Sequence, residues 1–202
     1  MLTGLAAFSL AAALLTVTPG LDTALVLHTA AREGAAAAWR AALGIALGCL
    51  AWGVLAAAGL SAALLASSTL FATLRLAGAA YLVWLGIALL WDSTVRSSKP
   101  VEARGATPFR RGLLTNLLNP KVGLFYVAFL PQFIPPGGDV LALTLAMAAI
   151  HAALGLAWFA LLIGATRKIG PWLARPAVSR TLDRLTGGLF VALGAKLALE
   201  AR

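Results

Sequence analysis

Thr18-Pro19-Gly20-Leu21-Asp22 interrupts an apolar stretch of helical length, and Asn119-Pro120-Lys121 interrupts a second one. The two prolines lie 101 residues apart in a chain of 202, so each half contains one interruption. Proline removes a backbone donor and clashes with the preceding turn, which frees carbonyls inside the helix. In hydrocarbon, such broken helices occur only where they face protein or a water-filled cavity. Paired interruptions in two halves of a chain therefore indicate a transporter binding site.

The composition around these motifs is that of an integral membrane protein. Hydrophobic residues make up 61% of the chain and charged residues 11%, and the mean hydropathy is +0.92. Soluble domains contain roughly 45–50% apolar and about 25% charged residues. The length fits one membrane domain over residues 1–202. The lone Cys49 excludes an intramolecular disulfide and argues against redox or thiolate–metal chemistry, so we expect it to be a small packing residue.

Six apolar runs are expected to cross the membrane: residues 4–31, 39–65, 70–91, 112–133, 140–166 and 182–199. The first run exceeds the roughly 20 residues that a span needs, as expected for two half-helices joined by a hinge. In the second run, Gly44 and Gly48 form a small-xxx-small pair that lets helices approach closely.

A polar linker at residues 92–111, with Pro100 and Pro108, separates a first repeat (1–91) from a second (112–202). A second set of three spans must begin on the opposite side of the membrane. The sequence therefore predicts an all-α 3+3 inverted repeat whose first and fourth helices are broken. The likeness of Leu85-Gly86-Ile87-Ala88-Leu89 to Leu193-Gly194-Ala195-Lys196-Leu197 favours this arrangement.

The positive charges predict the orientation. The loops between spans 1 and 2, 3 and 4, and 5 and 6 lie on one side of the membrane. Only three basic residues, Arg75, Lys196 and Arg202, lie on the opposite side. The three loops together contain twelve Lys and Arg residues: Arg32, Arg40, Arg96, Lys99, Arg104, Arg110, Arg111, Arg167, Lys168, Arg175, Arg180 and Arg184. The positive-inside rule places these loops in the cytoplasm and both termini outside. This asymmetry accounts for the net charge of +9 without a nucleic-acid partner.

Asp22 is the only carboxylate well inside a predicted span, and Lys121 is the only lysine near a predicted midplane. Asp22 lies ten residues before Arg32, and Lys121 lies ten residues after Arg111. At 1.5 Å per residue, both lie roughly 15 Å deep in a core of about 30 Å. Each charge costs about 2.5–3.5 kcal/mol there, which indicates function. The alternative, compatible with the first, is a structural pair that holds the first and fourth helices together.

Other polar residues near the interruptions are weaker candidates. Thr18 and Asn119 precede the two prolines and can bond either substrate or freed carbonyls. Asn116 lies one turn earlier on a neighbouring face, and Gln132 is expected at the interface. Tyr81 and Tyr126 are expected to pack, and His28 and His151 lack partners at metal-ligand spacing, so no metal or cofactor is predicted.

These motifs resemble those of the lysine exporter (LysE/RhtB) family. Thr18-Pro19-Gly20-Leu21-Asp22 resembles its Thr-Pro-Gly-Pro-Asp signature, with Leu21 in place of a second proline. Asn119-Pro120-Lys121, with Phe125-Tyr126 and Phe129-Leu130-Pro131-Gln132-Phe133, resembles the second signature, and Gly78-Ala79-Ala80-Tyr81-Leu82 resembles the third helix. The resemblance covers essentially the whole chain. It implies export of amino acids or close derivatives, driven by the proton gradient.

The sequence thus predicts a multi-pass secondary transporter, not an enzyme, in the bacterial inner membrane. It would export an amino acid or similar zwitterion in exchange for protons through a site made by Thr18, Pro19, Gly20, Asp22, Asn116, Asn119, Pro120 and Lys121. Asp22 is the expected proton-coupling group, and Lys121 is the alternative. The Ala- and Gly-rich faces are compatible with a homodimer.

Three other functions compete with this prediction. The first is a cation or metal exporter of the same superfamily, against which the absence of Cys pairs, His clusters and a second buried carboxylate argues. The second is an intramembrane enzyme acting on lipid, for which one buried carboxylate is too few. The third is a helper subunit without transport of its own.

Overall fold

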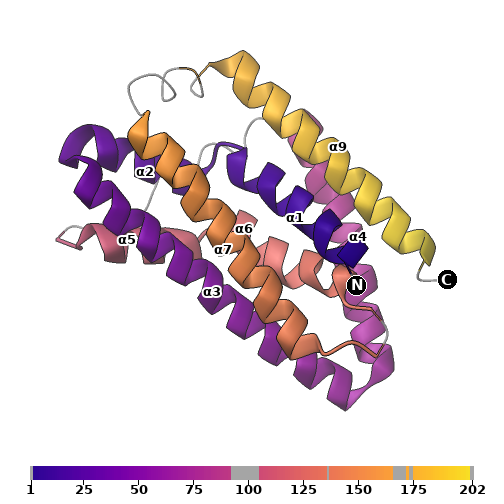
Figure 1. Ribbon diagram of the computed structural model, residues 1–202. Helices are drawn as coiled ribbons and strands as arrows, with labels where there is room; N and C mark the ends of the chain where they lie inside the picture. Colours follow the sequence, from indigo (N-terminus) through magenta and orange to yellow (C-terminus); the bar gives the residue numbers. More distant parts are fainter. Residues whose placement is uncertain (1, 92–104, 136, 166–171, 173–174, 201–202) are drawn as a thin grey trace.

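A computed structural model describes residues 2–91, 105–135, 137–165, 172 and 175–200, and this part of the chain is helical throughout, without strands. The elements in chain order are α1 (Leu2–Val17), α2 (Leu21–Glu33), α3 (Ala35–Ala66), α4 (Ser68–Trp91), α5 (Pro108–Leu117), α6 (Pro120–Leu124), the π-helix η2 (Phe125–Phe129), the 3-10 helix η3 (Leu130–Phe133), α7 (Val140–Gly164) and α9 (Pro176–Glu200) (Figure 1). The all-α prediction is confirmed.

Both predicted helix breaks are present. The axis bends by 49° between α1 and α2, and by 50° between α5 and the segment that starts with α6. Among the described residues, α3 and α7 are long and apolar enough to cross a membrane, and counting each bent pair as one span raises the number to four. In α4, residues Leu76–Ala88 form a shorter apolar segment.

Three predicted boundaries are wrong. Helix α3 begins at Ala35 because Gly34, with φ of 89°, makes the turn after α2 in a single residue. Helix α5 begins at Pro108, so the last four residues of the predicted linker are helical, whereas residues 92–104 lie outside the described part. Helix α9 begins at Pro176 rather than at residue 182 and is 25 residues long, not the shortest.

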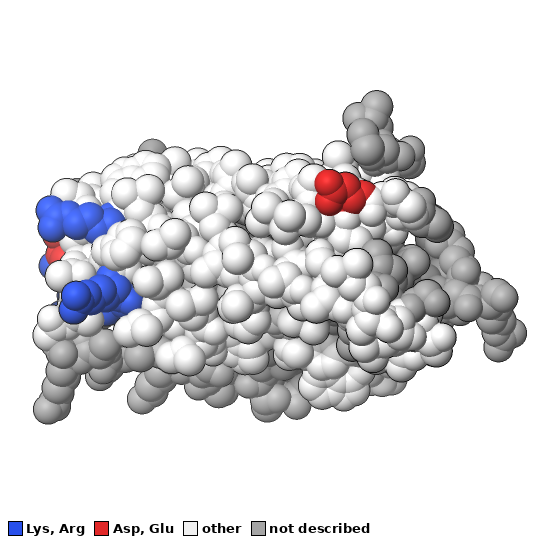
Figure 2. Space-filling model, turned by 90° about the horizontal axis from the view of Figure 1, so that it is seen from below, with Lys and Arg blue, Asp and Glu red and all other residues white. Residues whose placement is uncertain are grey.

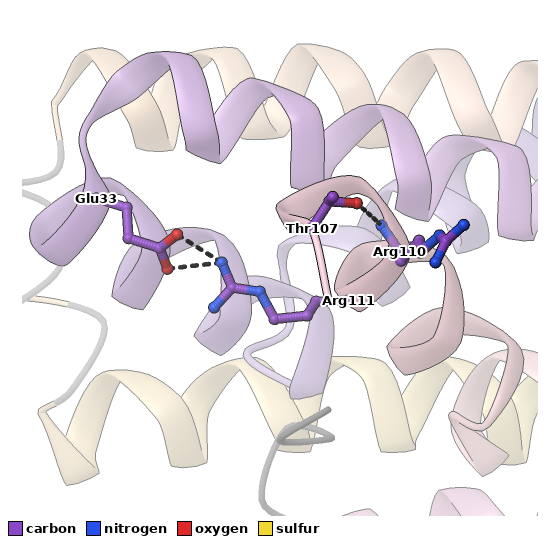
Figure 3. Close-up of polar contacts among 4 residues, drawn as sticks. All are labelled: Glu33, Thr107, Arg110 and Arg111. Carbon is purple, nitrogen blue, oxygen red and sulfur yellow. Dashed lines mark hydrogen bonds and ion pairs between the residues drawn. The ribbon is translucent and has the colours of Figure 1, made fainter. Parts of the chain in front are cut away.

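The start of α5 has a local cause. The Thr107 hydroxyl accepts a hydrogen bond from the Arg110 amide at 3.4 Å, and Pro108 occupies the first helical position (Figure 3). A threonine N-cap followed by proline is a strong helix start. Next to it, Arg111 forms an ion pair with Glu33 at 2.6 Å, which joins α5 to the end of α2.

The ends of the bundle differ in charge. Figure 1 shows both termini near one end, whereas the α2–α3 turn and the starts of α5 and α9 lie toward the other. On the face drawn in Figure 2, the visible lysine and arginine side chains gather at one end, and the long surface beside them carries none.

Two apolar clusters form the core. The larger one is rich in aromatic rings and joins α1, η2 and α9 through Phe8, Phe125, Phe129 and Phe190. The smaller one joins α2, α3 and α7 and consists of Val26, Ala38, Ala42, Ile45, Phe159 and Leu162. The broken helices meet between the two clusters, and this is where the polar groups of both motifs are found.

Candidate substrate-binding site

The first break leaves one backbone carbonyl without its helical partner. Pro19 has no N–H for the Leu15 carbonyl, whereas the Thr18 amide still reaches the Leu14 carbonyl at 3.1 Å. Helix α2 restarts after Gly20 and carries Asp22 in its first turn. A carboxylate at that position is stabilised by the positive end of the helix dipole.

Lys121 from the second motif bonds the exposed end of α1. Its ammonium donates to the Leu15 carbonyl and to the Thr18 carbonyl, both at 3.3 Å. A cation at the C-terminal end of a helix interacts favourably with its dipole and satisfies its last carbonyls. A lysine from the second half of the chain therefore satisfies backbone carbonyls at the break in the first half.

The second break is bonded differently. The Asn119 side-chain oxygen accepts from the Lys121 amide at 3.1 Å and so caps α6, in which Pro120 takes the first position. Pro120 frees the Asn116 carbonyl, which accepts from the Asn119 amide at 3.1 Å and from the Trp52 indole at 3.4 Å. At the second break, the side-chain donor to the freed carbonyl is thus the neutral Trp52 indole of α3, whereas at the first break it is the Lys121 ammonium.

Asp22 is hydrogen-bonded to Asn116 and also interacts electrostatically with the Asn119 side chain. Its Oδ2 accepts from the Asn116 amide at 2.8 Å, whereas its Oδ1 is buried and has no hydrogen-bond partner. Within the described residues, no ion pair of 4.0 Å or less joins Asp22 to Lys121, although the two charges interact electrostatically. The structural pair, which the sequence left as an alternative, therefore has no direct contact: Asp22 is bonded by Asn116, and Lys121 is bonded to two backbone carbonyls.

A cavity of about 50 Å³ lies beside Asp22. Its wall contains Thr18, Gly20, Asp22, Asn119 and Lys121, which are five of the eight predicted site residues. The remaining wall comes from α1, α2, α3, α6 and α7 and includes Leu15, Thr16, Thr23, Ile45, Ala46, Cys49, Val122, His151, Ala152, Gly155 and Phe159. The cavity has room for only a few water molecules and is too small for an amino acid.

The other three predicted site residues lie outside the cavity wall. Pro19 and Pro120 form the breaks, and Asn116 lies behind Asp22 with no exposed surface. Gly48 makes room for Asn116, because a Cβ at that position would lie 2.5 Å from the Asn116 side-chain oxygen. Gly44, likewise, packs against the α5 backbone, so both predicted close approaches are present.

Helix α9 brings two polar residues that the sequence reasoning missed. Thr186 is fully buried and hydrogen-bonded to the Thr18 hydroxyl at 2.6 Å, and the buried Asp183, one turn earlier, interacts electrostatically with Lys121. Asp22 is therefore not the only carboxylate inside the bundle. A helix begun at Pro176 would have placed both residues on the face that carries Phe190, and this spacing was the available signal.

One further expectation is wrong, and two others are confirmed with an added polar contact. Gln132 is buried rather than interfacial and donates to the Ala128 carbonyl at 3.2 Å. Tyr126 does pack in the core, but its hydroxyl also lies 3.2 Å from Nδ1 of His151, and both groups are buried. Cys49 packs in the core as expected and in addition accepts a hydrogen bond from Asn116 at 3.5 Å.

Known relatives align with nearly the whole chain. It is 32% identical over 200 residues to the uncharacterized membrane protein YrhP of Bacillus subtilis, which covers 94% of this chain and 95% of that protein. It is 30% identical to a homoserine/homoserine lactone efflux protein of Salmonella typhimurium (95% and 94% covered) and 39% identical to a leucine efflux protein of Enterobacter sp. (57% and 56% covered). No solved structure matches. Residues 13–201 match the LysE type translocator family, and the chain belongs to that family.

Proposed function

We propose that this LysE family exporter carries an amino acid or a similar small zwitterion out of the cell in exchange for protons. Relatives named for efflux of leucine and of homoserine support a small amino-acid substrate. The wall of the cavity favours a neutral side chain, since Ile45, Val122, Ala152 and Phe159 are apolar.

The observation that carries the proposal is the unpartnered Oδ1 of Asp22. A buried carboxylate oxygen without a hydrogen bond is costly and requires a cation or a proton. The ammonium of a zwitterion and a proton would compete for the same atom. This competition couples the two fluxes, because the site releases one when it takes the other.

Lys121 has a different role in this proposal. Two of its three N–H donors bond carbonyls at the end of α1, which leaves one donor for the substrate carboxylate. The titrating group is therefore Asp22, and Lys121 holds the hinge and balances its charge.

A 3+3 inverted repeat is part of the proposal. A Cβ at Gly86 of α4 would lie 2.6 Å from the Gly187 carbonyl oxygen, and a Cβ at Gly194 of α9 would lie 2.8 Å from that of Ala79. Residues 86 and 194 are 108 positions apart, and so are residues 79 and 187. Each contact thus has a counterpart with the helices exchanged, as a two-fold axis between α4 and α9 requires.

The distribution of exposed arginines supports the proposed orientation in the bacterial inner membrane. Exposed arginines lie at the α2–α3 turn, at the start of α5 and near the start of α9, namely Arg32, Arg40, Arg110, Arg180 and Arg184. With this end in the cytoplasm, both termini lie outside. Reporter fusions at residue 202 and within residues 92–104 test the orientation, and a cytoplasmic C-terminus would contradict it.

Uptake into inside-out vesicles tests the transport function. Vesicles with an acidic lumen should accumulate L-leucine or L-homoserine, and collapse of the pH gradient should stop the accumulation. The variant Asp22→Asn should accumulate neither, whereas Asp139→Asn, which changes an exposed carboxylate at the start of α7, should behave like the wild type. Uptake that ignores the pH gradient would contradict antiport. A wild type that moves neither amino acid would contradict amino-acid export.

The buried Asp183 favours a second candidate, a cation exporter. Two carboxylates, Asp22 and Asp183, interact with Lys121. The lysine repels a metal ion from the space between them, and no cluster of three or more metal-type side chains occurs in the described part of the chain. Manganese uptake by the same vesicles would favour this alternative.

A further inference from the structure

A chain of buried polar groups connects Asp22 to His151 across the middle of the bundle. Asn116 of α5 donates to Asp22 and also to the Cys49 sulfur of α3 at 3.5 Å. The Cys49 thiol interacts electrostatically with the Tyr126 hydroxyl, which lies 3.2 Å from Nδ1 of His151 on α7. Asp22, Cys49 and His151 all line the same cavity.

The direction of the first two hydrogen bonds follows from the carboxylate at one end. A carboxylate only accepts, so the amide nitrogen of Asn116 must face Asp22, and its second N–H meets the sulfur. At the other end, the Tyr126 hydroxyl can donate to Nδ1 of His151. An imidazole that accepts there carries its proton on Nε2.

Such a chain orients groups and does not conduct protons. The Asn116 amide cannot accept a proton on its nitrogen and pass on another, so the relay stops between Asp22 and Cys49. The ring of His151 is also held by neighbouring aromatic rings, with centroid distances of 5.2 Å to Phe125 and 5.6 Å to Tyr126. The imidazole is therefore held in position by these two rings.

We propose that His151 is a substrate-binding residue whose Nε2–H donates to the carboxylate of the bound zwitterion, with Tyr126 as the residue that fixes this tautomer. This inference rests on the proposed function. Asp22 supplies an acceptor for the ammonium from α2, and His151 supplies a donor from the α7 wall of the same cavity. Together they recognise the two ends of an α-amino acid, and a ligand whose carboxylate is replaced by a neutral carbonyl keeps only a weaker, neutral hydrogen bond to His151.

Paired probes that differ at the carboxylate test the inference. The KM for transport by the purified protein in proteoliposomes is measured for L-leucine and L-leucinamide, and for L-homoserine and its lactone. In His151→Phe, the KM for the amino acid should rise about tenfold to a hundredfold, because a hydrogen bond to a charged group is lost. The KM for the amide or the lactone should stay within about threefold of the wild type, which lies inside the range of a neutral contact.

Two further variants separate contact from packing. His151→Gln keeps an N–H donor and should restore most of the preference for the amino acid. Tyr126→Phe keeps the ring but loses the hydroxyl that fixes the tautomer, and it should weaken the preference in the same sense. Melting temperatures in detergent verify that each variant is folded, and Tyr126→Phe carries the test if His151→Phe does not fold.

Three results would overturn the inference. Equal changes of KM for both members of a pair would make His151 a packing residue, and unchanged values for the amino acid would remove it from the site. In both cases a transporting wild type leaves the proposed function intact. If the wild type transports no member of either pair, the proposed function fails and this inference fails with it.

Discussion

Each of the two helix breaks frees one backbone carbonyl four residues before its proline, and different partners bond the two carbonyls. The Leu15 carbonyl receives the Lys121 ammonium, and the Asn116 carbonyl receives the Trp52 indole. The ammonium sits on a flexible chain and borders the cavity, whereas the indole is fixed by its bulk against Gly123. We therefore expect transport to be more sensitive to changes at the first break than to changes at the second.

The largest expected effect comes from removing the two partners in turn. Lys121→Met leaves the Leu15 and Thr18 carbonyls without their donor, at a cost of about 1–3 kcal/mol each in stability. Trp52→Phe keeps the ring and loses one weak hydrogen bond, at about 0.5–1.5 kcal/mol. Thermal unfolding in detergent measures both. Equal losses would contradict the difference between the two breaks.

Replacing each proline sharpens the same comparison. Pro19→Ala supplies an amide for the Leu15 carbonyl, lets α1 run on toward α2, and should lower transport by about tenfold or more. The sequence predicts a comparable loss for Pro120→Ala. The structure reduces that expectation to less than about threefold, because Pro120 occupies the first position of α6, where no donor is needed. Initial uptake rates in inside-out vesicles compare the two, and a larger loss in Pro120→Ala would reverse the assignment.

A smaller effect is expected at the cap of the second break. Asn119→Ala removes the acceptor for the Lys121 amide and should cost about 1 kcal/mol, as for other N-caps. Thr107→Ala, which removes the N-cap of α5 at the surface, is the matched control. If Asn119→Ala abolished transport without changing the melting temperature, Asn119 would be a substrate ligand rather than a cap.

The smallest effect is expected where the two halves meet at the basic end. Glu33→Gln removes the ion pair with Arg111, whose side chains are 37% and 19% exposed. Exposed pairs contribute about 0.2–1 kcal/mol and are screened by salt. The difference in melting temperature from the wild type should vanish at high ionic strength. A loss that persists there would give this pair a larger part in joining α2 to α5.

The helix breaks could be predicted from the sequence because their chemistry is local. A proline within a helix frees a backbone carbonyl whatever the helix packs against. The expected depth of Asp22 and Lys121 likewise depends only on their distance of ten residues from an arginine along the helix. The partners of these groups could not be predicted in this way. Lys121 reaches Leu15, and Thr186 reaches Thr18, only because α1, α6 and α9 converge in space.

The missed Asp183 illustrates a second limit. Apolar membrane helices are hydrophobic on all sides, so the pattern does not show which face is buried. The charges near the start of α9 then indicate an interfacial segment, although Arg180 and Arg184 are exposed and Asp183 faces the core. The spacing of Asp183 from Phe190 shows that they share a face only once the helix is known to begin at Pro176, and tertiary packing then decides that this face is buried.

A double-variant cycle on Asp22 and Lys121 tests the central claim most directly. Folded yield and proton-driven uptake into inside-out vesicles are measured for the wild type, Asp22→Asn, Lys121→Met and the double variant. We predict that Asp22→Asn is as well folded as the wild type and inactive. We also predict that the double variant is no more stable than Lys121→Met, because the lysine bonds carbonyls rather than the carboxylate. Poor folding of Asp22→Asn that Lys121→Met restores, together with normal uptake, would contradict the account and make the two charges a structural pair.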